Sequence, residues 1–76
     1  MNKERRKRLK KIHEMLSEVC SELESVKDEE EENFENIPEN LQNSERYDKA
    51  AHTVELLEDA CCYLDDVMQF VEEACE

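Results

Sequence analysis

The chain has 76 residues, of which 22 are acidic and 10 basic, with one proline and no glycine. A chain of this length forms one domain at most, and its single hydrophobic core is marginal. Without glycine, the tight turns of a sheet have little to be made from, whereas an abundance of Glu, Lys, Leu and Arg is typical of long helices. The composition therefore predicts an all-α protein and argues against a β-rich one.

The basic and acidic side chains occupy different parts of the sequence. Residues 1–11 carry seven basic side chains and one acid, whereas residues 12–76 carry 21 acids and three bases. The basic start is not followed by the apolar stretch of a signal peptide, and no apolar run is long enough to span a membrane. We therefore expect a cytoplasmic protein that does not bind membranes, with its four cysteines reduced.

The first helix is predicted over residues 3–35, with Asn2 as its N-cap. Its apolar residues recur at alternating intervals of three and four, which indicates one stripe facing a neighbouring helix. The stripe consists of Leu9, Ile12, Leu16, Val19, Leu23 and Val26. Pro38 ends the helical pattern, because its ring disfavours helical geometry in the residue before it.

Residues 36–44 form the predicted connection, in which Leu41 is expected to cover the end of the core. Either Asn43 or Ser44 then caps a second helix over residues 45–75. Two helices of about 30 residues each, joined by a connection this short, form an antiparallel hairpin. We expect the whole chain to be one such hairpin domain.

The second helix is apolar over more of its surface than one neighbour can cover. With Tyr47 at heptad position a, apolar residues fill positions a and d through four heptads. Rows c and g are also largely apolar, so the apolar arc covers about half of the helix. These two rows contribute Leu56, Ala60, Tyr63, Val67, Phe70 and Ala74. We expect them to form a dimer or partner interface, with two hairpins pairing as a coiled-coil-like homodimeric four-helix bundle.

The basic residues are concentrated at the start of the first helix, which we call the basic head. They are Lys3, Arg5, Arg6, Lys7, Arg8, Lys10 and Lys11. A basic cluster can bind nucleic acid or another anionic surface. In an antiparallel hairpin, however, the basic head lies beside the acidic end of the second helix, where the two clusters compensate each other and their opposed helix dipoles. We expect such neutralisation, and direct nucleic-acid binding through residues 3–11 is the alternative.

An acidic run lies at the end of the first helix, next to the connection. It consists of Asp28, Glu29, Glu31, Glu32, Glu35 and Glu39. Glu30 falls within it, on the stripe that faces the neighbouring helix. Such a run is either a solvated helix face or a surface that docks on a basic partner, as the phosphates of a nucleic acid do. A calcium loop is excluded, because there is no glycine turn and no alternating Asp/Asn pattern.

The cysteine and histidine residues do not form a recognisable metal motif. An antiparallel hairpin brings Cys20 near Cys61 and Cys62, but there is no C-x-x-C, and adjacent residues on a helix point about 100° apart. His52 and Glu55 are in the reverse order of the Glu-x-x-His motif of di-metal bundles. We expect small buried thiols, no metal and no cofactor. No nucleophile–base pair can be identified either, so we do not expect an enzyme.

Residues 33–46, with the sequence NFENIPENLQNSER, resemble the bend of short acidic helical-hairpin proteins of Gram-positive bacteria, their phages and mobile elements. In those proteins a similar Phe-x-Asn-Leu-Pro-x-x-Leu-Gln-x-Ser-Glu-Arg-like stretch joins two helices. The resemblance extends more loosely to both heptad stretches, implies a helical hairpin and transfers no catalytic or binding residue. The chain departs from the pattern in its cysteines and its basic head. Small acidic phage proteins include inhibitors of bacterial defence systems, so the resemblance favours a DNA-mimic inhibitor as an alternative function.

The sequence thus predicts a non-catalytic protein–protein interaction module. It is expected to pair with itself and to bind, through its acidic end, another protein that has a basic surface. One alternative is an acidic DNA mimic that inhibits a nucleic-acid enzyme, as an anti-defence protein does. A second is an RNA-binding bundle that resembles the plasmid copy-number regulator Rop and uses the basic head.

Overall fold

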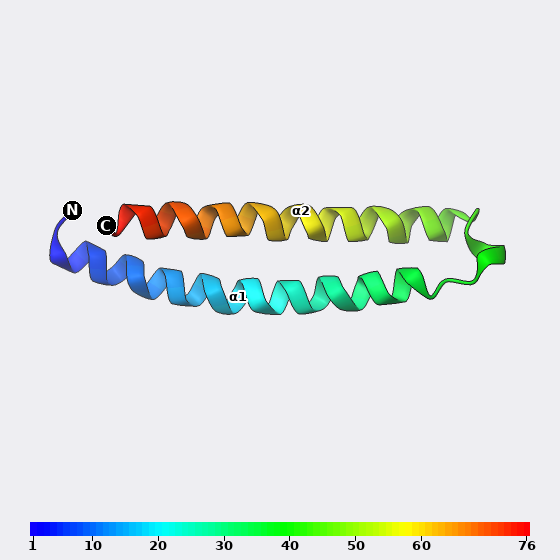
Figure 1. The fold of residues 1–76 in the computed structure, drawn as a ribbon, viewed down its shortest axis with the longest axis horizontal. Helices are drawn as coiled ribbons and strands as arrows, with labels where there is room; N and C mark the ends of the chain where they lie inside the picture. Colours follow the sequence, from blue (N-terminus) through cyan, green and yellow to red (C-terminus); the bar gives the residue numbers. More distant parts are fainter.

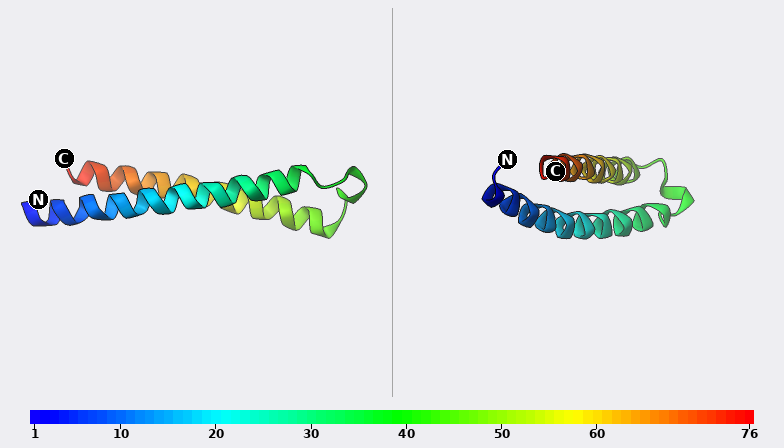
Figure 2. Two further views of the ribbon diagram at one scale, coloured as in Figure 1. Left: turned by 90° about the horizontal axis from the view of Figure 1, so that it is seen from below. Right: turned by 60° about the vertical axis from the view of Figure 1, so that its left-hand side comes forward.

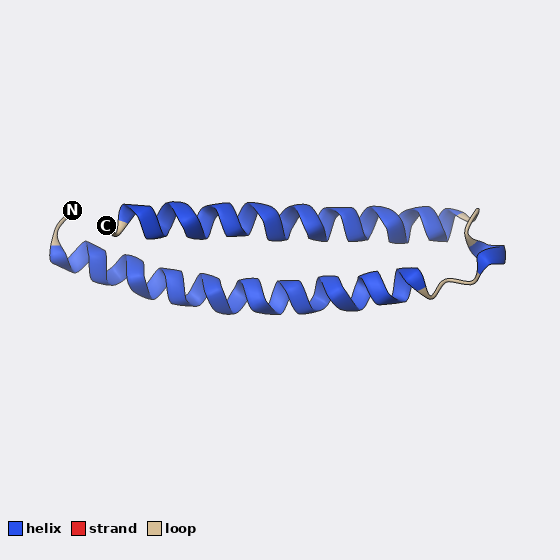
Figure 3. Cartoon of the chain, viewed as in Figure 1, coloured by secondary structure: helices blue, strands red, loops and turns tan.

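The computed structural model describes residues 1–76, which form two long antiparallel helices and no strand (Figures 1 and 3). Helix α1 spans Lys3–Glu35, a 3₁₀ turn (η1) spans Glu39–Leu41, and helix α2 spans Glu45–Ala74. The hairpin measures 59 × 15 × 13 Å. The two termini lie at one end, which we call the open end, and the bend lies at the other (Figure 1). The expected all-α hairpin is confirmed.

Both helices begin at side-chain caps. The Asn2 side chain accepts a hydrogen bond from the backbone N–H of Arg5 at 2.8 Å, and the Ser44 hydroxyl accepts one from the N–H of Tyr47 at 3.2 Å. Each bond satisfies a backbone donor that the first helical turn leaves without a partner. Asn2 is thus confirmed as the first cap, and Ser44, rather than Asn43, is the second.

The bend is closed by two aromatic rings. The ring centroids of Phe34 and Tyr47 are 4.8 Å apart, with the planes inclined at 31°. Aromatic pairs favour such offset, tilted arrangements. Leu41 was expected to cover the end of the core, but its side chain is 48% exposed. This prediction was wrong, because the aromatic pair already fills the space between the helix ends and the 3₁₀ turn holds Leu41 outside it.

The side chains with which α1 faces α2 differ in part from the apolar stripe that was predicted to face it. Ile12, Val19 and Val26 are 39%, 54% and 42% exposed, so they lie outside the seam. A row of partly polar residues takes their place, because long basic side chains pack their aliphatic stems along an apolar neighbour while the charged ends reach water. The half-buried residues of α1 are Arg6, Leu9, His13, Leu16, Cys20, Leu23, Lys27, Glu31 and Phe34. With Arg6 at heptad position a, the apolar stripe of α1 occupies rows d and g.

The interior of the hairpin is small. Val54 is the only buried residue, at 8% exposure, because each helix is covered on one side alone. The helices cross at a shallow angle and stay side by side along their length (Figure 2), as in coiled coils. Neither helix has a stretch both long and apolar enough to cross a membrane.

We predict that Val54→Ala destabilises the chain by about 1.5 kcal/mol more than Thr53→Ala, since valine loses two buried methyl groups. Thr53 is a nearly isosteric, exposed neighbour, so the gain in helix propensity is similar in the two variants. Urea unfolding followed by circular dichroism, at one protein concentration at which both variants are monomeric, measures the difference. Equal destabilisation by both substitutions would contradict the assignment of Val54 to the seam.

Candidate functional site

The register of the hairpin is fixed by contacts near its two ends. At the open end, the Cys75 thiol donates a weak hydrogen bond to the carbonyl oxygen of Arg6, with 4.0 Å between sulfur and oxygen. At the bend, Phe34 pairs with Tyr47. In both pairs the two residue numbers add to 81, so position i of α1 is level with about position 81 − i of α2.

The exposed apolar residues of the two helices lie at matching levels. In this register Val19 is level with Tyr63, within about one residue, or about 1.5 Å along the axis. One heptad toward the open end, Ile12 is level with Phe70. One heptad toward the bend, Val26 is similarly level with Leu56. The apolar side chains thus form three layers centred on Val19 and Tyr63.

These layers lie on one side of the hairpin. In an antiparallel pair, the g rows of both helices flank one side of the seam and the e rows flank the other. Asn33 and Arg46, both at g, line one surface hollow together. Lys10 and Glu72, both at e, line another. Exposed side chains at c and g of both helices therefore share one face, and those at e, b and f share the other, which we call the polar face.

We call the first of these the apolar face. Tyr63 and Phe70 are its most exposed large side chains, at 71% and 69%. A contiguous apolar surface over the middle of a helix pair is unusual for an isolated soluble chain and marks an interaction site. The apolar face consists of Ile12, Met15, Val19, Val26, Leu56, Ala60, Tyr63, Val67, Phe70 and Ala74.

The six interface residues predicted on α2 all belong to this face, together with four residues of α1 that were not predicted there. Three of those four were assigned to the seam. The signal that could have placed them correctly is the heptad recurrence of Arg6, His13, Cys20 and Lys27. A row of that composition beside an apolar stripe indicates that the stripe is turned away from the centre of the seam.

The acidic residues largely avoid the apolar face, whose two ends carry the basic side chains of Arg5, Arg8, Arg46 and Lys49. Glu22 and Glu29 are the only acids at c or g positions of either helix, and every other helical acid except Glu30 occupies e, b or f. The polar face therefore carries nearly all of the negative charge. The hairpin as a whole is amphipathic, with one apolar side and one acidic side.

The basic head lies beside the end of α2, but no ion pair joins the two (Figure 1). The ion pairs of the chain are Lys27 with Asp28 at 3.2 Å and the exposed contact of His52 with Glu55 at 3.9 Å. The expected neutralisation therefore does not take the form of direct salt bridges. The two clusters can interact only through longer-range fields, which salt screens.

The acidic run is largely free of partners. Asp28 is its only member in an ion pair, and all of its members except Glu31 are exposed. Both hydrogen bonding and Coulombic attraction to Asp28 raise the pKa of Lys27 above its ordinary value, so this side chain remains charged at neutral pH. The other carboxylates face water and are accessible to a partner.

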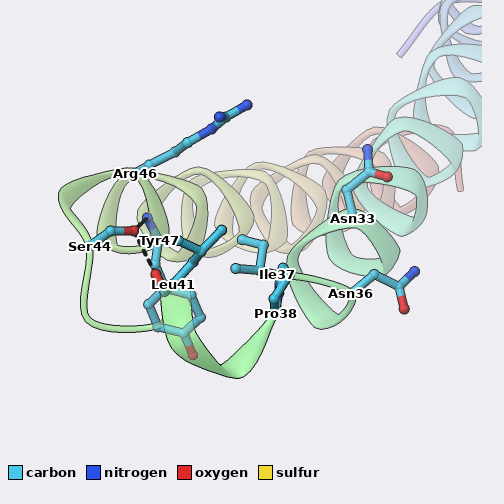
Figure 4. A pocket seen from close by; sticks show the side chains of 8 residues that line it. All are labelled: Asn33, Asn36, Ile37, Pro38, Leu41, Ser44, Arg46 and Tyr47. Atoms are coloured by element: carbon cyan, nitrogen blue, oxygen red, sulfur yellow. Dashed lines mark hydrogen bonds between the residues drawn. The ribbon is translucent and has the colours of Figure 1, made fainter.

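A hollow of about 410 Å³ lies at the bend next to the acidic run (Figure 4). Ile37, Leu41 and the ring of Tyr47 gather around it, while Arg46 extends away from the chain. The exposed Leu41 side chain therefore belongs to a surface feature rather than to the core. Apolar side chains of this kind beside charged ones resemble the anchoring points of protein interfaces.

The four cysteines are free thiols in different surroundings. The Cys20 thiol donates a hydrogen bond to a carboxylate oxygen of Asp65 at 3.3 Å, and this bond, assisted by burial, raises the pKa of Cys20. Burial is the main cause of the raised pKa of Cys61. Cys61 is close enough to Cys20 to influence its ionisation, whereas Cys62 is exposed. No group of three metal-binding side chains lies close enough together to hold an ion.

Two surfaces of the hairpin are thus suited to interaction, the apolar face and the acidic run with its neighbouring hollow. Comparisons with protein-family models, with curated proteins and with solved structures found no match to this chain. The chemistry of the two surfaces is the basis for assigning a function.

We predict that the Cys20 thiol is alkylated with a pH midpoint above that of an ordinary thiol, because its hydrogen bond to Asp65 favours the protonated form. The measurement is the rate of iodoacetamide labelling against pH in a variant that keeps Cys20 alone. Adding Asp65→Asn should lower the midpoint, since a neutral amide does not repel the thiolate. A variant that keeps Cys62 alone serves as the exposed reference, and the prediction fails if both thiols share one midpoint.

Proposed function

We propose that this chain is a non-catalytic protein–protein interaction module that works as a homodimeric four-helix bundle. The observation that carries the proposal is the apolar face, in which exposed apolar residues of α1 and α2 lie at matching levels. A lone hairpin leaves Leu56, Tyr63 and Phe70 in water, and burying each of them is worth roughly 1.5–3 kcal/mol.

The size of the apolar face suits an interface. The apolar side chains of α2 run from Leu56 to Ala74, about 27 Å at 1.5 Å per residue. They therefore form the centre of an interface whose full area, about 800 Å² per partner in stable complexes, also takes in the flanking polar side chains. The rotation of α1 about its own axis also supports a bundle. Its rows d and g turn toward the middle of such a bundle, and the polar a row lies at the edge, where the Lys27 ammonium pairs with Asp28.

We further propose that the acidic run at the bend is the surface that binds another protein. Glu29, Glu32, Glu35 and Glu39 are exposed and have no ion-pair partner, so a basic partner gains new ion pairs there without breaking existing ones. Such charges mainly speed association and select the partner, whereas nearby apolar side chains provide anchoring. Ile37, Leu41 and Tyr47 at the bend hollow supply that apolar contact.

One observation favours a specific kind of basic partner, an enzyme that acts on DNA. Five consecutive acids, from Asp28 to Glu32, place one negative charge per about 1.5 Å of helix axis. Duplex DNA carries one per about 1.7 Å. An acidic inhibitor that imitates DNA is therefore our second candidate function.

For self-association, we predict a dimer by sedimentation equilibrium at micromolar concentration. The double variant Val19→Glu, Tyr63→Glu should be monomeric, because it places charges at the centre of the apolar face. The matched control Ser21→Glu, Gln69→Glu adds the same charge on the polar face and should remain dimeric. A well-folded monomer of the unaltered chain would overturn this part of the proposal.

For the acidic surface, we predict that changing Glu29, Glu31, Glu32 and Glu35 to glutamine leaves helicity intact or slightly raised, because like charges at i, i+3 and i, i+4 repel. Binding to the partner isolated from host cells should weaken through a slower on-rate with a smaller salt dependence. Surface plasmon resonance at two salt concentrations measures both effects.

The matched control neutralises four acids of the polar face of α2, remote from the acidic run: Asp59, Asp66, Glu72 and Glu73. It makes the same change in net charge and should have little effect on the on-rate. If binding instead survives without the acidic run and is lost when Arg5 and Arg8 become glutamine, the basic head is the working surface. That result would favour a nucleic-acid ligand, as in a Rop-like bundle.

A further inference from the structure

The charge of the hairpin differs sharply between its ends. Residues 27–54, at the bend, carry nine acids and three bases, a net charge of −6. At the open end, residues 1–16 and 65–76, which lie at matching levels, together carry seven bases and seven acids, a net charge of zero. A second hairpin that approaches the apolar face therefore meets very different fields in its two possible orientations.

Two hairpins stacked through their apolar faces can be related by a two-fold axis in two ways. An axis along the hairpin places both bends at the same end, where two clusters of net charge −6 lie side by side. An axis across the hairpin places each bend beside the open end of the other copy. Like charges brought together at an interface act against that arrangement, so the second orientation is favoured.

The apolar layers fit this second orientation. They are centred on Val19 and Tyr63, so an axis at that level superimposes the apolar stretch on its own copy. It stacks α1 on α1 and α2 on α2, each pair antiparallel. Arg8 lies eleven residues before Val19, and the position eleven residues after it is Glu30. Glu29 is one residue from that level and occupies row c, as Arg8 does.

On the basis of the proposed self-association, we infer that the occupant of the apolar face is a second copy of this chain in antiparallel orientation, with Arg8 of each copy facing Glu29 of the other. This arrangement neutralises part of the basic head between molecules, which accords with the absence of ion pairs between the head and α2 within one hairpin. It also divides the acidic run. Glu29 faces the second copy, whereas Asp28, Glu32 and Glu35 stay on the polar face, available to a different protein.

The orientation can be measured directly with one spin label per chain on the exposed bend. The variant Asn40→Cys is made in a background with the four native cysteines replaced by alanine, whose folding is checked by circular dichroism. Pulsed electron paramagnetic resonance should give a distance of roughly 60 Å between the two labels, since each bend lies about 20 residues of helix from the two-fold axis. A parallel bundle would give a distance below about 25 Å, the width of four packed helices.

A charge exchange tests the same contact with the native cysteines in place. Arg8→Glu should weaken the dimer roughly three- to tenfold at low salt, and adding Glu29→Arg should restore it. Lys11→Glu makes the same change in net charge on the polar face and should have a smaller effect.

The outcomes separate this inference from the proposal on which it rests. A dimer with a short interlabel distance, or one that Glu29→Arg fails to restore, overturns the antiparallel arrangement and leaves self-association standing. A chain that sediments as a monomer overturns both. A dimer with the long distance and restored affinity supports both.

Discussion

The seam between α1 and α2 is the contact on which the rest of the structure depends. Helix α2 offers an apolar arc about half of its circumference wide, and α1 covers only part of it. Because α1 meets α2 with leucines at d and with a mixed row at a, its remaining apolar residues turn to the g side. The antiparallel geometry then places them beside the g row of α2. The roll of one helix about its own axis thus creates the apolar face.

Charge is arranged around the same geometry. The acids occupy the e, b and f rows of both helices almost without exception, so the polar face and the apolar face are separated as cleanly as on a single amphipathic helix. Along the length, the bases gather at the open end and the acids at the bend. The molecule therefore has two polarities, one across its width and one along its axis, and each has a different physical role. In the proposed dimer, the first drives the burial of the apolar face, and the second distinguishes the two possible orientations.

Much of the fold follows from local signals in the sequence. Asn2 and Ser44 each offer a side-chain acceptor at the start of a heptad pattern, and Pro38 prevents α1 from continuing, so the helix ends could be placed closely. The seam of α1 could not be placed in the same way. Leu9, Leu16 and Leu23 belong equally to a stripe with Ile12 and to a row with His13, and an interval pattern does not say in which direction a stripe points.

The remaining differences arise from contacts between residues distant in the sequence. The hydrogen bond from Cys20 to Asp65 depends on the register and on the roll of α1, which no local pattern specifies. Leu41 was assigned to the core on hydrophobicity alone, whereas the Phe34–Tyr47 pair fills that space first. In the candidate site, the six α2 residues were identifiable because they exceed what one neighbour can cover. The corresponding α1 residues could not be identified, because their spacing also fits a seam between only two helices.

The closeness of the two termini at the open end (Figure 1) has a consequence for the topology. A short linker could join Glu76 to Met1, and the chain could instead be opened within residues 36–44, where the backbone is exposed. Such a circular permutant would place α2 before α1 and keep every contact of the seam. Its change in loop-closure entropy would be small, because that entropy varies only slowly with loop length. The hairpin is therefore specified by the facing surfaces of the helices, and the order of the two helices along the chain can be exchanged.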